Sequence, residues 1–361
     1  MRKGYVPVFG DVFASNELAA NDRAGNNSVL WTLYHENRGR PVLFQMRGIQ
    51  PSLLIHDPKF MEDFIDLPIE KFDRIPEYPF EGKMDIFVNL ITKDENFNGR
   101  KAPMMKALGM ARSFIHVPTV IEVCLTHLKK LKRGDRVLVD KFAVDLPYDI
   151  AATLIFGEAL NKVGKVDYIN PVTNEQSKIE FYDSVSAFVN DLYVVEGDPW
   201  HLAFPIIQKL KLQKMTKAIA TNNVNMGIVL KDYLSRSKVT KSAYHTLLNE
   251  KKYSADVVLS DAIAVLAVGW DLSHMVMRLI YEISHLPDAR HQIKQEVNKF
   301  VLKDGKYSLN QLSEWLSHEI LDKMTYVNNF VKEVLRVESG DNSFTRMAHQ
   351  TITHSSGLVI P

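Results

Sequence analysis

Three residues in one apolar stretch of the sequence are of types that could take part in chemistry. Gly269, Asp271 and Ser273 lie close together in the run ADVVLSDAIAVLAVGWDLSHMVMRLIYEISHL, which spans residues 255–286. Glycine costs about 1 kcal/mol relative to alanine in a helix interior, and polar groups are costly in an apolar environment. One interpretation is a groove in a buried helix, lined by the acid and the hydroxyl, that faces a ligand. The alternative is a close helix crossing over Gly269, with Asp271 turned toward solvent.

The element that must position these residues is a helix over residues 255–286. Its apolar positions continue without interruption up to Pro287, and at 1.5 Å per residue it is roughly 48 Å long. Apolar side chains on nearly every side predict a buried helix that crosses the whole molecule. A membrane span is not expected, because the run contains five ionisable residues, which are costly in a bilayer: Asp261, Asp271, His274, Arg278 and Glu282.

A second pair of chemical groups lies in the run MTYVNNFVKEVLRV, residues 324–337. Glu333 and Arg336 are three positions apart, so they share one face of the expected helix. Pairs of this kind are usually solvated surface pairs. Here apolar neighbours on both sides predict that Arg336 is partly buried and binds its partner with two hydrogen bonds.

The composition excludes several classes of protein. The sequence has 44 basic and 43 acidic residues, a net charge of +1, so nothing indicates a nucleic-acid partner. Its one cysteine, Cys124, rules out an internal disulfide framework and any multi-cysteine metal site. Cys124 falls in the apolar stripe of an expected helix and is interpreted as a core residue. Residues 157–165 resemble a phosphate-binding loop only superficially, because their spacing is wrong.

The chain has no linker or low-complexity run, which predicts a single domain over residues 1–361. No signal peptide or membrane anchor is recognised before the fold, so we expect a soluble or peripheral protein, cytoplasmic or on a cytoplasmic-facing membrane. The loop EGDPWHLAFP, residues 196–205, and the basic helix after it form a candidate membrane contact. Packing of Trp200 and Phe204 in the core is the favoured alternative.

Helices dominate the expected elements. They cover residues 27–36, 100–114, 118–131, 142–156, 180–195, 255–286, 291–301, 309–321 and 324–337, with a long basic helix after residue 205. A hairpin of residues 41–46 and 52–55 forms the only clear sheet, residues 136–139 resemble a further strand, and residues 158–177 read as a polar insertion. The sequence therefore predicts a mainly α protein with a small β-sheet.

In the order of its motifs the chain resembles a cytochrome P-450, a haem-thiolate monooxygenase. Residues 268–272, VGWDL, resemble the family's oxygen-binding segment in its long central helix. Residues 332–336, KEVLR, resemble its glutamate-x-x-arginine helix, and residues 346–348 and 357–361 resemble the strand pair beyond it. Residues 53–58, LLIHDP, and residues 97–101, which lack the family's tryptophan, give weaker support. The resemblance covers essentially the whole chain.

The resemblance implies a triangular, mostly helical domain that holds haem between its central helix and a cysteine loop. Gly269 and Asp271 would line the oxygen side, with the acid helping to deliver a proton, and Ser273 is a further candidate there. Arg100, Lys101 and Arg346 would bind the haem propionates. Glu333 and Arg336 would fix the core around the cysteine loop without taking part in the chemistry.

Two departures from the family pattern stand out. Leu272 replaces the family's threonine and has no proton to give. The sequence given ends at Pro361, before the loop that carries the iron-ligating cysteine, so this chain is expected to be incomplete, to provide no metal ligand and to be inactive alone.

The expected function of the complete form is insertion of one oxygen atom from O2 into an apolar small molecule, with electrons from a reductase. The alternative is a haem-free relative that serves as a binding or structural protein without catalytic activity.

Overall fold

The computed structural model describes residues 42–47, 50–55, 57–65, 72–73, 95–109, 115–132, 134, 136–196, 205–301, 316–337, 347–348, 350–355, 357 and 359–360. Its helices in chain order are α3 (Pro58–Ile65), α4 (Glu95–Ala107), α5 (Val117–Leu128), α6 (Val139–Phe156), α7 (Phe181–Glu196), α8 (Pro205–Arg236), α9 (Ala243–Glu250), α10 (Ala255–His285), α11 (Pro287–Val301), α13 (His318–Lys323) and α14 (Thr325–Val337).

The described strands form four antiparallel pairs. They are β1 (Val42–Arg47) with β2 (Gln50–Ile55), β3 (Phe72–Asp73) with β6 (Met347–Ala348), β4 (Lys165–Ile169) with β5 (Gln176–Glu180), and β7 (Ile352–Thr353) with β8 (Val359–Ile360). The expected fold class, mainly α with a little antiparallel β-structure, is confirmed.

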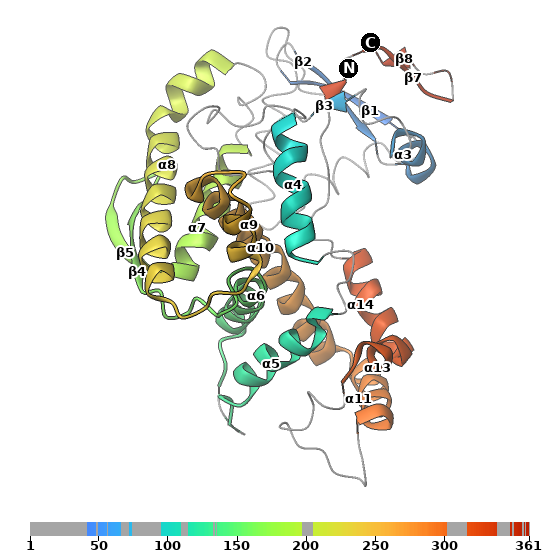
Figure 1. Ribbon diagram of the computed structural model, residues 1–361. Coiled ribbons are helices and arrows are strands. Elements are labelled where there is room, and N and C mark those ends of the chain that lie inside the picture. The colour runs from blue at the N-terminus through green and yellow to red at the C-terminus, as the bar shows by residue number, and fades with distance from the viewer. Residues whose placement is uncertain are drawn as a thin grey trace.

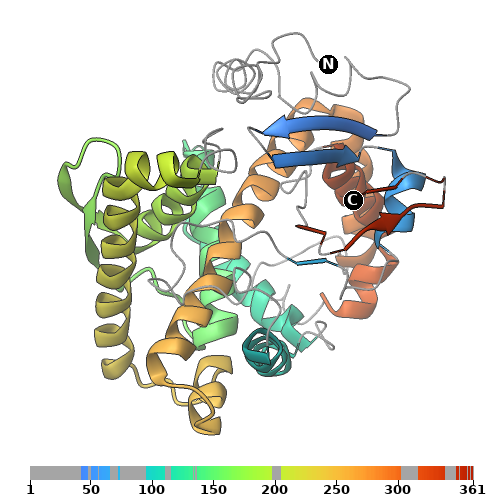
Figure 2. The ribbon, with the colours of Figure 1, turned by 90° about the horizontal axis from the view of Figure 1, so that it is seen from above.

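The helix α10 runs through the middle of the molecule (Figures 1 and 2). On one side lie α6, α7 and α8, and on the other side lie α11, α13 and α14 (Figure 1). The short strands of β1, β2, β7 and β8 gather with α3 at one corner (Figure 1). The main hydrophobic core joins α10 to α6, α7, α8 and α9, so α10 is a buried central helix, as its apolar residues predicted.

The ends of the helices follow local sequence signals. Ser254 caps α10 by accepting a hydrogen bond from the backbone N–H of Val257, and Pro287 follows its last turn. Gly157 ends α6 in the left-handed conformation, with φ of 83°. A side chain there would also clash, because a Cβ atom would lie 2.7 Å from Val239 Cγ1.

The sequence analysis missed the β4–β5 hairpin, which replaces most of the expected polar insertion. Helix α8 binds the outer edge of β4 through an asparagine side chain. The amide of Asn222 accepts from the Ile169 N–H at 2.7 Å and donates to the Ile169 carbonyl at 2.8 Å, as a neighbouring strand would. A partner so distant in sequence cannot be recognised from strand periodicity alone.

Other expected boundaries changed or could not be compared. Residues 136–138 form no strand, and Val139 already begins α6. Helix α4 begins before Arg100, at Glu95. The expected helix at residues 27–36, the loop tip at Trp200 and Phe204, and most of the helix at residues 309–321 lie outside the described residues. Among the described residues, no helix is both long and apolar enough to cross a membrane.

Candidate functional site

The close crossing over Gly269 is the first feature of the candidate site. A Cβ atom at Gly269 would lie 2.7 Å from Cδ1 of Tyr148 and 3.4 Å from its Cα atom. Real Cβ atoms do not approach other atoms so closely, so Gly269 allows α6 to pack directly on the backbone of α10. The close helix crossing that the simpler interpretation expected is therefore present, but Asp271, which that interpretation turned toward solvent, is half-buried.

Ser273 lies on the same side of α10 and is buried. Its hydroxyl donates a 2.6 Å hydrogen bond to the carbonyl oxygen of Gly269, one turn earlier. This bond satisfies the hydroxyl within its own helix. Ser273 is thus turned toward the α6 contact.

Asp271 lies on a different face of α10. It is two residues from both Gly269 and Ser273, which places it roughly 160° around the helix from each. Its side chain is half-buried. The three residues therefore do not line one shared groove, and that part of the expectation is corrected, because a spacing of two residues separates faces in a helix.

Beside Asp271, α10 exposes an apolar side chain. Leu272 is 37% exposed, whereas most residues of α10 between Val258 and Ala267 are buried. Leu272 lies on nearly the same face as Asp261 and Val265, because residues four and eleven positions apart return to one side of a helix. This face forms a stripe that starts at Asp261 and ends, roughly 16 Å further along, at Leu272.

Arg100 of α4 binds the other end of that stripe. Its Nε atom donates to Oδ2 of Asp261 at 2.9 Å, and its Nη2 atom contacts Oδ1 of the same carboxylate. Both side chains are only 6% exposed. The carboxylate partner of Arg100 in this structure is thus Asp261, which the sequence analysis had not connected with it.

The other two candidate haem-binding residues lie elsewhere. Lys101 follows Arg100 on α4 and its side chain is exposed. Arg346 lies outside the described residues. A role for Arg100, Lys101 and Arg346 in binding haem propionates stays a prediction.

The pair Glu333–Arg336 forms, but it is not buried. Arg336 donates from Nε at 2.8 Å and from Nη2 at 2.7 Å to the two carboxylate oxygens of Glu333. The side chains are 68% and 60% exposed. The hydrogen bonds from Arg336 lower the pKa of Glu333. The expected partial burial of Arg336 is therefore wrong for the described residues, because α14 turns Val334 inward and this face outward.

Cys124 lies on α5 and is half-buried. Burial raises the pKa of its thiol, which disfavours the thiolate form. A nucleophilic cysteine needs the opposite shift. The interpretation of Cys124 as a packing residue agrees with this position.

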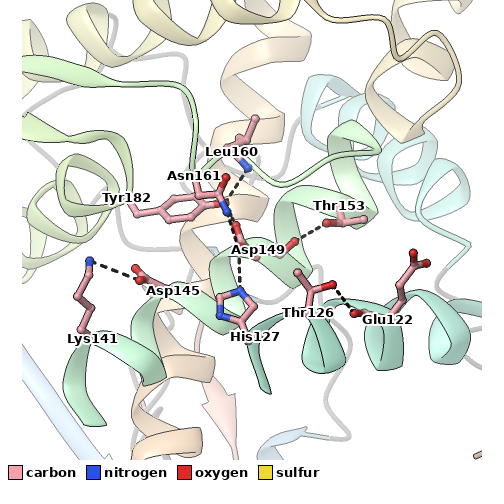
Figure 3. Close-up of polar contacts among 10 residues, drawn as sticks. All are labelled: Glu122, Thr126, His127, Lys141, Asp145, Asp149, Thr153, Leu160, Asn161 and Tyr182. Carbon is pink, nitrogen blue, oxygen red and sulfur yellow. Dashed lines mark hydrogen bonds and ion pairs between the residues drawn. The ribbon is translucent and has the colours of Figure 1, made fainter. Parts of the chain in front are cut away.

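The sequence analysis missed a buried polar cluster between α5, α6 and α7 (Figure 3). Oδ2 of Asp149 lies 2.7 Å from Nε2 of His127 and accepts from the amide of Asn161 at 3.3 Å. Its Oδ1 accepts from the hydroxyl of Tyr182. The one available signal was Asp149, one of two aspartates in the otherwise apolar run of residues 142–156.

A cavity of about 460 Å³ lies away from these residues, at the end of α8. It contains none of the candidate residues, since it is lined by Glu158, Tyr233, Arg236, Ser237, Lys238 and Val239. Within the described ranges, no group of three or more His, Cys, Asp or Glu side chains is arranged to hold a metal ion.

Comparison with known proteins agrees with the fold. The family model for Cytochrome P450 matches residues 19–361, nearly the whole sequence, and the chain belongs to this family. Among solved structures it is similar to retinoic acid-bound cyanobacterial CYP120A1. That similarity has a TM-score of 0.66 at 16% identity and covers 99% of this chain and 73% of that one, so it shows the fold alone. A search of curated proteins found no match.

Proposed function

We propose that this protein, in its complete form, is a haem-dependent monooxygenase that inserts one oxygen atom from O2 into an apolar small molecule, with electrons from a reductase. Membership of the cytochrome P450 family supports the general class. The observation that carries the proposal further is the stripe of α10 that ends at the exposed Leu272. Leu272 is an exposed apolar side chain next to the buried half of α10, a position that is compatible with contact to an apolar ligand.

Asp271 is the residue of α10 that we assign to proton handling. It is half-buried and adjacent to Leu272, at the uncovered end of the stripe. Leu272 has no proton to give, and the hydroxyl of Ser273 is bonded to Gly269 on another face. In this proposal, Asp271 is the group of α10 that holds or passes a proton.

Haem supplies the oxygen chemistry of this family, and the fit of this chain to haem is incomplete. Cys124 lies half-buried on α5, where burial raises the pKa of its thiol. Arg100 would reach a propionate only by sharing its guanidinium with Asp261. We propose that the thiolate ligand comes from sequence outside these 361 residues.

The first test is to sequence the transcript beyond the codon for Pro361 and to titrate hemin into this chain and into the extended product. We expect the extended product to take up stoichiometric haem with a thiolate-type spectrum, and this chain to lack that spectrum. A stop codon directly after Pro361, together with no haem uptake, would contradict the proposal and favour a haem-free binding protein.

The role of Asp271 is tested in the haem-loaded extended form. Asp271→Asn is expected to lower turnover while haem content stays unchanged, because the amide cannot pass a proton. Asp256→Asn is the matched control, since Asp256 lies in the first turn of α10 and forms an exposed ion pair with Lys231. Equal turnover of the two variants would remove Asp271 from the mechanism.

A further inference from the structure

Two tyrosines stack in the interior beside α10. Tyr148 of α6 and Tyr182 of α7 are both buried. Their ring centroids are 5.1 Å apart and their planes are inclined by 18°. The ring of Tyr148 also fills the space over Gly269. Continuous contact therefore leads from the middle of α10 through Tyr148 to Tyr182.

The two hydroxyl groups have chemically different partners. The hydroxyl of Tyr148 shares a 3.1 Å hydrogen bond with the neutral hydroxyl of Ser186. The hydroxyl of Tyr182 donates to the carboxylate of Asp149 and accepts from the Leu160 N–H at 2.9 Å. A carboxylate is a far better proton acceptor than a serine hydroxyl. Of these two tyrosines, Tyr182 is the one that can release a proton to its partner.

Asp149 is held in place to accept that proton. His127, Asn161 and Tyr182 converge on its two oxygen atoms from three separate parts of the chain (Figure 3). Burial raises the pKa of Tyr182 above its ordinary value, and the nearby charge of Asp149 raises it further. The phenol therefore keeps its proton in the resting protein.

Stability alone gives little reason for this arrangement. Well-packed apolar side chains often stabilise a core as well as a buried polar cluster does, because each buried polar group loses its hydration. A phenol next to a fixed base, in contrast, can lose an electron and a proton together. Removing an electron makes a phenol hydroxyl a strong acid, and the fixed base avoids placing a positive charge in the core.

We propose that Tyr182 is a one-electron donor whose oxidation is coupled to proton transfer to Asp149. The electron leaves to a one-electron oxidant, the O–H bond of Tyr182 breaks, and an O–H bond forms on Asp149. The products are a neutral phenoxyl radical and a carboxylic acid that is still hydrogen-bonded to His127. A reductant of the thiol or ascorbate class returns the electron, and Asp149 returns the proton.

Tyr148 is the relay in this proposal. It contacts α10 on one side and stacks on Tyr182 on the other, and its hydroxyl bonds to the neutral hydroxyl of Ser186. An oxidising equivalent that arises beside α10 would pass through Tyr148 and come to rest on Tyr182. The identity of the natural oxidant rests on the proposed monooxygenase function, whereas the chemistry of Tyr182 and Asp149 does not.

The test uses the full chain without haem, so it is independent of the proposed function. A ruthenium(II) polypyridine is attached to Thr126→Cys in a Cys124→Ser background, which places one photo-oxidant on α5 next to His127. A light flash with an electron acceptor generates ruthenium(III), and electron paramagnetic resonance detects tyrosyl radicals. Tyr182→Phe keeps the ring stack and removes the hydroxyl. Tyr244→Phe, at a buried tyrosine of α9 that packs on Phe156, is the matched control.

We expect a tyrosyl radical that disappears in Tyr182→Phe and persists in Tyr244→Phe. We also expect its formation to slow in D2O, because a proton moves with the electron, and to slow further in Asp149→Asn. If Asp149→Asn does not fold, the isotope effect on the parent protein still tests the proton transfer. A radical signal that is unchanged in Tyr182→Phe, or that forms at the same rate in H2O and D2O, overturns the proposal.

Discussion

The two arginine–carboxylate pairs of this protein differ in almost everything except their chemistry. Arg336 and Glu333 are three residues apart on α14 and face outward. Arg100 and Asp261 are 161 residues apart, join α4 to α10, and are buried. Both arginines contact the two oxygens of one carboxylate. Apolar neighbours in sequence predicted burial of the first pair, yet only the second is buried.

The difference follows from what each pair must hold together. A pair within one helix can form before any tertiary contact and needs nothing to cover it. A pair between two helices brings both charges into the core, where the loss of hydration is large and each partner depends on the other. Four changes to the protein test and extend this comparison.

The largest effect is expected at the buried pair. Asp261→Ala leaves the guanidinium of Arg100 buried beside the vacated position, which costs about 3–5 kcal/mol of unfolding free energy. Urea denaturation measures this loss. The double variant Arg100→Met/Asp261→Leu should recover most of it, because neither charge remains. A loss below about 1 kcal/mol in Asp261→Ala, the range of exposed pairs, would show that the pair is not buried in solution.

The helix crossing beside the stripe should give the next largest effect. Gly269→Ala forces apart α10 and α6, because the added carbon would lie 2.7 Å from Tyr148. Overpacking of this kind costs about 1–3 kcal/mol. The control is Gly227→Ala in α8, where a Cβ atom meets nothing within 4 Å and should stabilise the helix by about 0.5–1 kcal/mol. The two variants should change the unfolding free energy in opposite directions. Equal changes would argue against a close crossing at Gly269.

Asp191 is a half-buried carboxylate, intermediate in burial between Asp261 and Glu333. Asp191 of α7 accepts a 3.0 Å hydrogen bond from Tyr168 of β4. Burial raises the pKa of Asp191 from 3.8 to about 6, despite the opposing effect of that bond. The folded state thus binds more protons than the unfolded state between these values, and stability from this group falls as pH rises through about 6.

Asp191→Asn keeps a hydrogen-bond acceptor and removes the titration. We expect the unfolding free energy of the parent, relative to this variant, to decline between pH 3.8 and about 6 and then level off. Urea unfolding across this pH range measures the difference. Parallel pH profiles for the two proteins would mean that the pKa of Asp191 is not raised.

The smallest effect is expected at the exposed pair. Arg336→Ala in this chain should leave the unfolding midpoint unchanged within error, because both partners are well hydrated. Urea or thermal denaturation measures the unfolding midpoint of the variant and of the parent protein. A loss as large as that of Asp261→Ala would mean that the face of α14 with Glu333 and Arg336 is covered in solution.

Local patterns in the sequence were sufficient for most helices. The limits of α10 followed from its apolar run, the cap at Ser254 and Pro287, and Gly157 marked the end of α6. Glycine, proline and capping residues act within a few positions, so their effect can be read without knowing the fold. The order of the motifs was also enough to identify the cytochrome P450 family.

The sequence did not predict which face of each helix is buried or which residues contact each other across helices. Gly269 was visible as an anomaly, but only the structure shows that Tyr148 occupies the space beside it. The acids Asp149 and Asp261 were likewise visible in apolar runs, whereas His127, Tyr182 and Arg100 come from other helices.

The sequence by itself therefore determined most of the helices, the family and the unusual residues of the central helix. Tertiary structure alone decided which of these residues meet, which arginine is buried and which face of α10 packs on α6. The physical reason is that capping and periodicity depend on neighbours along the chain. Burial and ion pairing depend on the surface that a distant element presents.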